Sequence, residues 1–262
     1  ELFGLFIPRG PVVQIQSAGG RTDVRGDRDP SISWEGPMSV LVNRLSASAS
    51  EIFAGAVQDY GRGLVIGSQT FGKGTVQALL PVNEGQLKLT IAKFYRISGQ
   101  STQHQGVIPD IQFQSAFDPT EIGESALDTA LPWDRIRSLR YRPIDTPQAR
   151  LAQLIDRHQA RIATDPDFKA LLKRTERALE LSGETGISLH LETRIQEREA
   201  NNQALLDIEN MRRESLGLET AQSVRALEAA AKEDAVSSDA SLLESARILL
   251  DEIQLNPRLA GL

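Results

Sequence analysis

A run of small residues, Ser46 to Ser50, follows an apolar stretch at 38–44 and begins a helical pattern over 46–61. A serine at a strand-to-helix junction can act as a nucleophile, because the first amides of a helix are unpaired and point outward. The amide N–H of Ala49 would then donate to a developing oxyanion. The alternative is structural, since serine is a favoured N-cap and small residues allow close helix packing.

A second candidate is Lys73, which stands between two glycines in the stretch FGKGT at 71–75. A serine nucleophile needs a base, and a lysine can serve as one if burial lowers its pKa towards neutrality. In an extended strand Gln77 falls on the same face as Lys73, where it could orient the amine. The alternatives are a solvated lysine at a hairpin tip and an ordinary cross-strand glutamine.

Composition and spacing exclude several other chemistries. The chain has no cysteine, and its three histidines are spaced too widely for a metal site or a histidine-based triad. The stretch from Gly67 to Lys73 has the glycine spacing of a phosphate-binding loop. However, Gly74 replaces the Ser or Thr that binds Mg²⁺, and a β-prone stretch replaces the helix that should follow. We therefore expect neither a metal nor a cofactor.

Two carboxylates, Glu51 and Asp59, lie on roughly the same side of the predicted helix. A negative charge at the start of a helix interacts favourably with its dipole, whereas one near the end opposes it. We therefore expect Asp59 to have a specific partner.

The residues around these candidates predict several strands and one helix. Extended segments are expected at 12–15, 38–44, 64–66, 75–80, 86–95 and 106–113, with a polar loop or irregular hairpin at 21–36. The helix at 46–61 carries an apolar stripe and ends at Gly61. Strand, helix and strand in close succession predict a βαβ unit with additional strands.

The composition changes near residue 116, after which Glu, Arg, Leu and Ala dominate. Helices are expected to begin near Thr146, Asp165 and Ser241, where capping residues precede apolar positions at helical spacing, and a long, charged and sparsely apolar helix is expected over 192–216. These patterns divide the chain into an α/β part, 1–115, and a mostly α-helical part, 116–262.

The chain of 262 residues has 29 basic and 35 acidic residues, a net charge of -6. An acidic chain of this kind is a poor candidate for binding nucleic acid. It also lacks an apolar run of the roughly 18–20 residues needed to span a membrane. The sequence begins at Glu1 rather than Met and shows no signal-peptide pattern, which we interpret as the mark of an incomplete chain.

Three motifs between Pro37 and Ile111 carry a resemblance to a known family: VLVNRLSASASEIFAGAVQDYGR, TFGKGTVQ and KFYRISGQSTQHQGVIPDI. This stretch resembles the tail-specific or C-terminal processing proteases, serine peptidases with a Ser–Lys catalytic pair, and is most similar to their bacterial periplasmic members. The helical remainder is similar to the C-terminal domain of that subgroup. The resemblance implies the C-terminal portion of an α/β protease core over 1–115 and a helical C-terminal domain over 116–262.

The resemblance also implies roles for single residues. It places the nucleophile at Ser48 and its partner at Lys73, with Gln77 assisting the lysine. Asp59 matches an aspartate considered important in this subgroup, and the N–H of Ala49 matches one oxyanion donor. The second donor, and the PDZ domain that engages substrate C-termini, belong to a segment upstream of this chain.

The function implied by the resemblance is that of a serine endopeptidase acting on periplasmic proteins with accessible, nonpolar C-termini. The implied partners are such substrates and a tetratricopeptide-repeat lipoprotein adaptor, and the implied location is the periplasm. The alternative is a chain without activity of its own, whose helical domain serves as an adaptor-binding module.

Overall fold

The computed structural model describes residues 2–231 and 239–256 of the chain. These residues form two compact units. The first unit holds 2–115, 119–152 and 252–256, and the second holds 116–118, 153–231 and 239–251.

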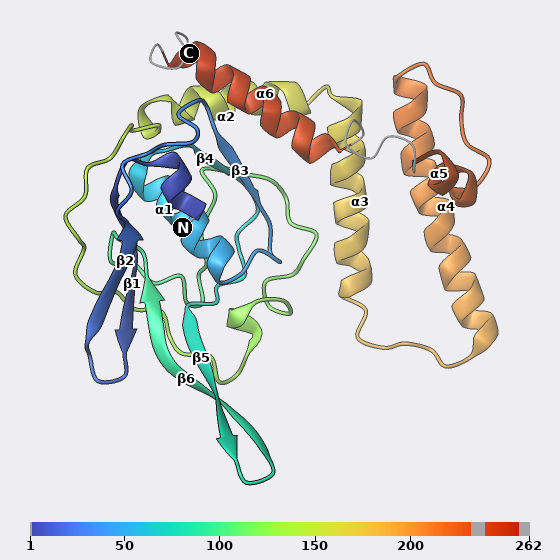
Figure 1. The fold of residues 1–262 in the computed structure, drawn as a ribbon. Coiled ribbons are helices and arrows are strands. Elements are labelled where there is room, and N and C mark those ends of the chain that lie inside the picture. Colours follow the sequence, from blue (N-terminus) through green and yellow to red (C-terminus); the bar gives the residue numbers. More distant parts are fainter. Residues whose placement is uncertain (1, 232–238, 257–262) are drawn as a thin grey trace. The chain divides into compact units, whose positions relative to one another are not determined.

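The first unit contains a four-stranded antiparallel sheet in the order β2-β1-β6-β5. Its strands are β1 (Gly10–Ser17), β2 (Thr22–Asp27), β5 (Thr75–Val82) and β6 (Gly85–Tyr95), and a 3₁₀ helix at Leu2–Phe6 precedes them. β5 and β6 form a long hairpin that extends away from the rest of this unit (Figure 1).

One face of the β5–β6 hairpin is apolar and exposed. Leu80 pairs with Leu87 and Ala78 with Leu89 across the two strands, so these side chains share a face. The three leucines are all exposed. Because β5 is the last strand of its sheet, the hairpin combines a free edge with a hydrophobic surface.

The second sheet of this unit is parallel and carries the predicted βαβ arrangement. β3 (Ser39–Val42) pairs with β4 (Leu64–Gly67), and β4 pairs with β7 (Ile111–Gln112). Helix α1 (Ala49–Tyr60) connects β3 to β4. Every residue of β4 is buried, which explains its continuous apolar sequence. Gly61 ends the helix in the left-handed conformation, as its place after the apolar stripe predicts.

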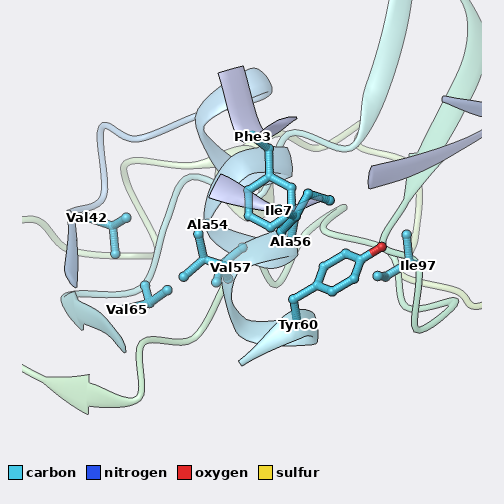
Figure 2. Close-up of a cluster of buried hydrophobic side chains, with 10 residues drawn as sticks. Phe3, Ile7, Val42, Ala54, Ala56, Val57, Tyr60, Val65 and Ile97 are labelled. Atoms are coloured by element: carbon cyan, nitrogen blue, oxygen red, sulfur yellow. The ribbon is translucent and has the colours of Figure 1, made fainter. Parts of the chain in front are cut away.

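The hydrophobic core of the first unit surrounds α1 (Figure 2). The rings of Phe3 and Tyr60 lie 5.5 Å apart, and Phe53 packs edge-on against Phe3. Burying a large apolar side chain contributes roughly 1.5–3 kcal/mol relative to leaving it exposed. This core fixes α1 and with it the helix N-terminus that carries the serine run. Its buried members are Phe3, Ile7, Val42, Ala54, Ala56, Val57, Tyr60, Val65, Ile97 and Val107.

The second half of the chain is helical, as its composition predicts. Asp165 accepts a hydrogen bond from the Phe168 amide, and Pro166 occupies the first turn, so these residues start α3. An α/β part followed by a mostly helical part is therefore confirmed. The helices are α2 (Gln148–Ile162), α3 (Pro166–Ser182), α4 (Leu191–Ser215), α5 (Val224–Ala231) and α6 (Ala240–Leu255).

A buried carboxylate links two helices of the second unit. Glu244 of α6 is 1% exposed; it accepts hydrogen bonds from Arg161 of α2 and is hydrogen-bonded to His158 Nδ1 at 2.9 Å. Burial alone would raise the pKa of Glu244, but these hydrogen bonds lower it overall. Some of the charge in this unit therefore lies inside it, rather than on the solvated helix faces where carboxylates are expected by default.

The structure differs from the sequence prediction in several elements. β2 lies within the polar 21–36 region, because its backbone pairs with β1 despite its polar side chains. Of the extended segment predicted at 106–113, only Ile111–Gln112 forms a strand, since Gly106 turns the chain with a φ of 64°. The short helix α5 has no counterpart in the prediction. Within the described ranges, no helix has the length and apolar character needed to cross a membrane.

Candidate active site

The serine run forms the turn between β3 and α1, with Ser48 at the N-cap of the helix. The backbone angles of Ser48, φ 57° and ψ −110°, lie in a region that residues with a Cβ rarely adopt. A sharp, strained strand-to-helix turn presents the nucleophile of many α/β-hydrolases. The sequence pattern of that turn is Gly-x-Ser-x-Gly, whereas here Ser46 and Ser50 stand in place of the two glycines.

Lys73 lies in the loop between β4 and β5, and close packing requires its two glycine neighbours. A Cβ added to Gly72 would lie 2.7 Å from the His104 carbonyl oxygen, and one added to Gly74 would lie 2.6 Å from the Gln103 amide nitrogen. Gly72 also has a φ of 91°. The glycines therefore let this loop lie against another segment of backbone, and Lys73 is half-buried.

Glu51, which is fully buried in α1, joins the serine turn to the lysine loop. One of its carboxylate oxygens accepts hydrogen bonds from the amides of both Ser48, at 2.8 Å, and Lys73, at 2.9 Å. The other accepts from the Thr70 hydroxyl at 2.6 Å and the Gly72 amide at 2.7 Å. A single carboxylate oxygen of Glu51 thus bridges the amides of Ser48 and Lys73, so the two backbones lie no further apart than the combined length of two hydrogen bonds.

Two opposing effects act on the Glu51 carboxyl. Burial raises its pKa above the ordinary value for a glutamate, while the hydrogen bonds that it accepts oppose this shift. All four groups that face it are donors in this arrangement, which suits the acceptor-only carboxylate. A direct bond from the Phe71 amide to the Ser46 carbonyl, at 2.9 Å, ties the two segments together as well.

The backbones of Ser48 and Lys73 are close, but within the described ranges no hydrogen bond joins the Ser48 hydroxyl to the Lys73 amine. The Ala49 amide, the first of α1, also makes no hydrogen bond to another described residue. Such an N–H at a helix N-terminus is free to donate to an incoming oxygen. The catalytic roles of these three residues stay predictions.

Gln77 is exposed on β5, where it pairs with Thr90. A register shift between Val76 and Gln77 interrupts the alternation of side chains from which its place beside Lys73 is expected. Its side chain makes no hydrogen bond within the part of the chain that the structure describes. Its role in orienting the lysine stays a prediction.

Asp59 has a specific partner, as its unfavourable place near the end of α1 predicts. Arg96 donates to Asp59 Oδ1 from Nη2 at 2.6 Å and from Nε at 3.1 Å. The Asp59 and Arg96 side chains are 5% and 14% exposed, so this ion pair is largely shielded from water. The same guanidinium donates to the Gly55 carbonyl and thereby fastens α1 to the chain after β6. A direct part for Asp59 in catalysis stays a prediction.

The described residues contain no group of three or more His, Asp or Glu side chains placed to hold a metal ion. His104 does contact the lysine loop, but through its backbone, whose amide donates to the Gly72 carbonyl at 2.8 Å.

Comparison with models of known protein families gives two matches that span nearly the whole chain. Residues 1–113 match peptidase family S41, and residues 117–254 match the C-terminal domain of tail specific protease. The chain therefore belongs to the tail-specific proteases of peptidase family S41.

Individual relatives agree with this family. The tail-specific protease of Haemophilus influenzae is 47% identical over 182 residues, which are 65% of this chain and 26% of that protein. The chloroplastic C-terminal processing peptidase of Tetradesmus obliquus is 37% identical over 119 residues, 45% of this chain and 26% of its own. A solved photosystem II D1 C-terminal processing protease shows 37% identity and a TM-score of 0.40, over 45% of this chain and 30% of that one. The chain thus spans about a quarter of the length of these curated relatives.

The sequence predicts roles for Ser48 and Lys73 but no role in the site for the carboxylate between them. Part of the signal for Glu51 is present, because a glutamate three residues after an N-cap serine is the pattern of a capping box. That pattern predicts the bond to the Ser48 amide. It cannot predict the bonds to amides 21 and 22 residues further along the chain, which depend on the fold.

Proposed function

We propose that this chain carries the catalytic pair of a serine endopeptidase, with Ser48 as nucleophile and Lys73 as general base. The neutral Lys73 amine accepts the hydroxyl proton while the Ser48 oxygen attacks a peptide carbonyl, and Ala49 N–H donates to the oxyanion. The Lys73 ammonium then protonates the leaving amine, and water hydrolyses the acyl-enzyme. General acid–base catalysis of this kind contributes roughly 10²- to 10⁴-fold.

The observation that carries this proposal is the strained backbone of Ser48 at the start of α1. Strain persists only where the surrounding structure restrains it, and it concentrates at functional sites. The bond to Glu51 supplies part of that restraint. A serine that only capped the helix could adopt ordinary extended angles without this cost. Because the same carboxylate oxygen holds the Lys73 amide, the strained serine lies beside a base candidate.

We infer that the substrates are periplasmic proteins with accessible, nonpolar C-termini. Family membership supports this inference, as do relatives described as tail-specific and carboxy-terminal-processing proteases. The PDZ domain and the second oxyanion donor would lie in the part of those relatives that this chain does not span. We therefore expect full activity only when that part is present.

For the helical unit we propose a second role, the docking of a tetratricopeptide-repeat lipoprotein adaptor. The segment between α3 and α4, together with the first residue of α4, exposes large apolar side chains: Ile187 is 73% exposed, Leu189 98% and Leu191 72%. Exposed apolar side chains that gather in one place mark interaction surfaces. Leu189→Glu should weaken adaptor binding in a pull-down without lowering cleavage of a denatured substrate; unchanged binding would refute this role.

The test of the catalytic pair compares two lysines in the full-length protease. Arginine cannot lose its proton at working pH, so Lys73→Arg should abolish cleavage of a denatured protein. Lys88→Arg, the same change at an exposed position of β6, should not. His104→Ala should also keep activity, because the contact of His104 with the lysine loop is made by its backbone. Normal cleavage by Lys73→Arg would refute the pair.

A chemical probe tests directly whether Ser48 is a reactive nucleophile. A serine-directed phosphonate should label Ser48 in the full-length protease and fail to label Ser48→Ala. The same probe applied to the 262-residue chain shows whether the nucleophile is reactive without the rest of the protein. Labelling at another serine would overturn the assignment.

A further inference from the structure

The lysine loop, Phe71–Gly74, is held on a second side by side chains that lie outside the serine turn. The Gly74 amide donates to Gln103 Oε1 at 2.8 Å, and Gln103 Nε2 donates to Glu124 Oε1 at 2.9 Å. The Glu124 amide in turn donates to the Phe71 carbonyl at 2.9 Å. Gln103 and Glu124 are both buried, so water competes little for these bonds.

Arg44, which follows β3, fastens the same two segments. Its guanidinium donates to the carbonyls of Thr70 at 2.7 Å and Ile122 at 2.6 Å, and to the Ser125 hydroxyl at 2.9 Å. The residue is 2% exposed, and burial lowers its pKa. Among the described residues, no carboxylate forms a salt bridge with this guanidinium. Because a buried charge without a partner is costly, its hydrogen bonds to carbonyl and hydroxyl oxygens are what stabilise it here. Its hydrogen bonds join Thr70, the residue before the lysine loop, to the segment 119–126.

We propose that Arg44, Gln103 and Glu124 are positioning residues that fix the lysine loop, so that Glu124, within the segment 119–126, belongs to the catalytic apparatus. This proposal rests on the proposed roles of Ser48 and Lys73. The segment lies outside the match to the peptidase family and inside the match to the C-terminal domain of tail specific protease. Part of that C-terminal region therefore acts in catalysis by holding the base in place.

The physical reason is the narrow tolerance of proton transfer. A base must come within hydrogen-bond reach of its nucleophile, and a displacement of about 1 Å can cost about 100-fold in rate. Glu51 holds the amides in the middle of the lysine loop. Gln103 and Glu124 hold its two ends, which Glu51 does not contact. Both sets of bonds are needed to fix the loop from two sides.

The experiment exchanges the glutamine at position 103 and the glutamate at position 124 in the full-length protease. Gln103→Glu alone brings two carboxylates into contact at a buried site, so kcat should fall about 100-fold with little change in KM. Adding Glu124→Gln restores one donor and one acceptor, and the double variant should recover most of the lost rate. Glu121→Gln makes the same chemical change at an exposed position of the same segment and should leave kcat unchanged.

Amide hydrogen exchange gives a readout that does not need activity. The Gly74 amide should exchange faster in Gln103→Glu and recover in the double variant. If Gln103→Glu does not fold, Glu124→Ala provides the same comparison. The proposal is wrong if these variants match Glu121→Gln in both kcat and exchange while Lys73→Arg is inactive. An active Lys73→Arg would instead show that the proposed function itself has failed.

Discussion

The strained turn at Ser48 leads to a prediction about stability that does not depend on activity. Its angles, φ 57° and ψ −110°, penalise any residue with a Cβ but not glycine. Ser48→Ala keeps the Cβ and Ser48→Gly removes it, while both remove the hydroxyl. The difference in stability between these two variants therefore isolates the strain.

The expected difference follows from two opposing effects. Backbone strain of this kind costs roughly 1–3 kcal/mol. Glycine gives the unfolded chain extra freedom, which offsets about 0.5–1 kcal/mol of the relief. We expect the free energy of unfolding to be about 1 kcal/mol higher for Ser48→Gly than for Ser48→Ala. For a chain of this size that is about 2–4 °C in Tm. Both variants should be inactive.

Tryptophan fluorescence during unfolding measures this difference in the right unit, because both tryptophans, Trp34 and Trp133, lie in the first unit. The matched control is Ala49→Gly, one residue further on, where the backbone is helical and glycine should lower stability. The reasoning fails if Ser48→Gly is no more stable than Ser48→Ala. It fails equally if Ala49→Gly produces the same gain.

Three further outcomes test other parts of the structure. Asp59→Ala should lower the free energy of unfolding of the first unit by about 3–5 kcal/mol, because it leaves Arg96 without its partner; a variant that is fully stable yet inactive would indicate a direct catalytic role. Thr102→Val should raise the free energy of unfolding by about 1 kcal/mol, because the Thr102 hydroxyl is buried without a hydrogen-bond partner among the described residues; an unchanged or lower Tm would contradict this. The pKa of Glu244 is lowered on folding, so its contribution to stability is present above the ordinary glutamate value of 4.5 and is lost as the pH falls through the folded value. Circular dichroism during acid titration should show a smaller loss of stability below pH 4.5 in Glu244→Gln than in the wild type, and identical acid transitions would show that other groups are responsible.

The βαβ unit could be predicted because its signals are local. β4 is buried throughout and is accordingly apolar throughout, and Gly61 marks the end of α1 where the apolar stripe ends. β2 could not be predicted in this way, since its pairing with β1 depends on the backbone and its side chains are polar. The register shift at Gln77 is likewise a property of the paired strands and not of one sequence.

The two short motifs of the candidate site could be predicted from the sequence, but the hydrogen bonds that connect them could not. Ser48 and Lys73 stand out because small residues and glycines surround them. Glu51 resembles an ordinary first-turn glutamate, although three of its four donors are backbone amides. Arg44 lies at the end of an apolar run and binds mostly carbonyl groups, which no side-chain pattern reveals. Backbone partners distant in sequence become visible only once the chain is folded.

The hydrophobic face of the β5–β6 hairpin has a practical consequence for handling the 262-residue chain. A leucine-rich ribbon at a sheet edge is a template for association with other molecules, so concentrated solutions should form oligomers. Leu80 and Leu87 face each other across the strands, so Leu80→Glu with Leu87→Lys would place opposite charges there. That pair of substitutions should give a monodisperse sample suited to NMR, with the loop around Lys73 left intact.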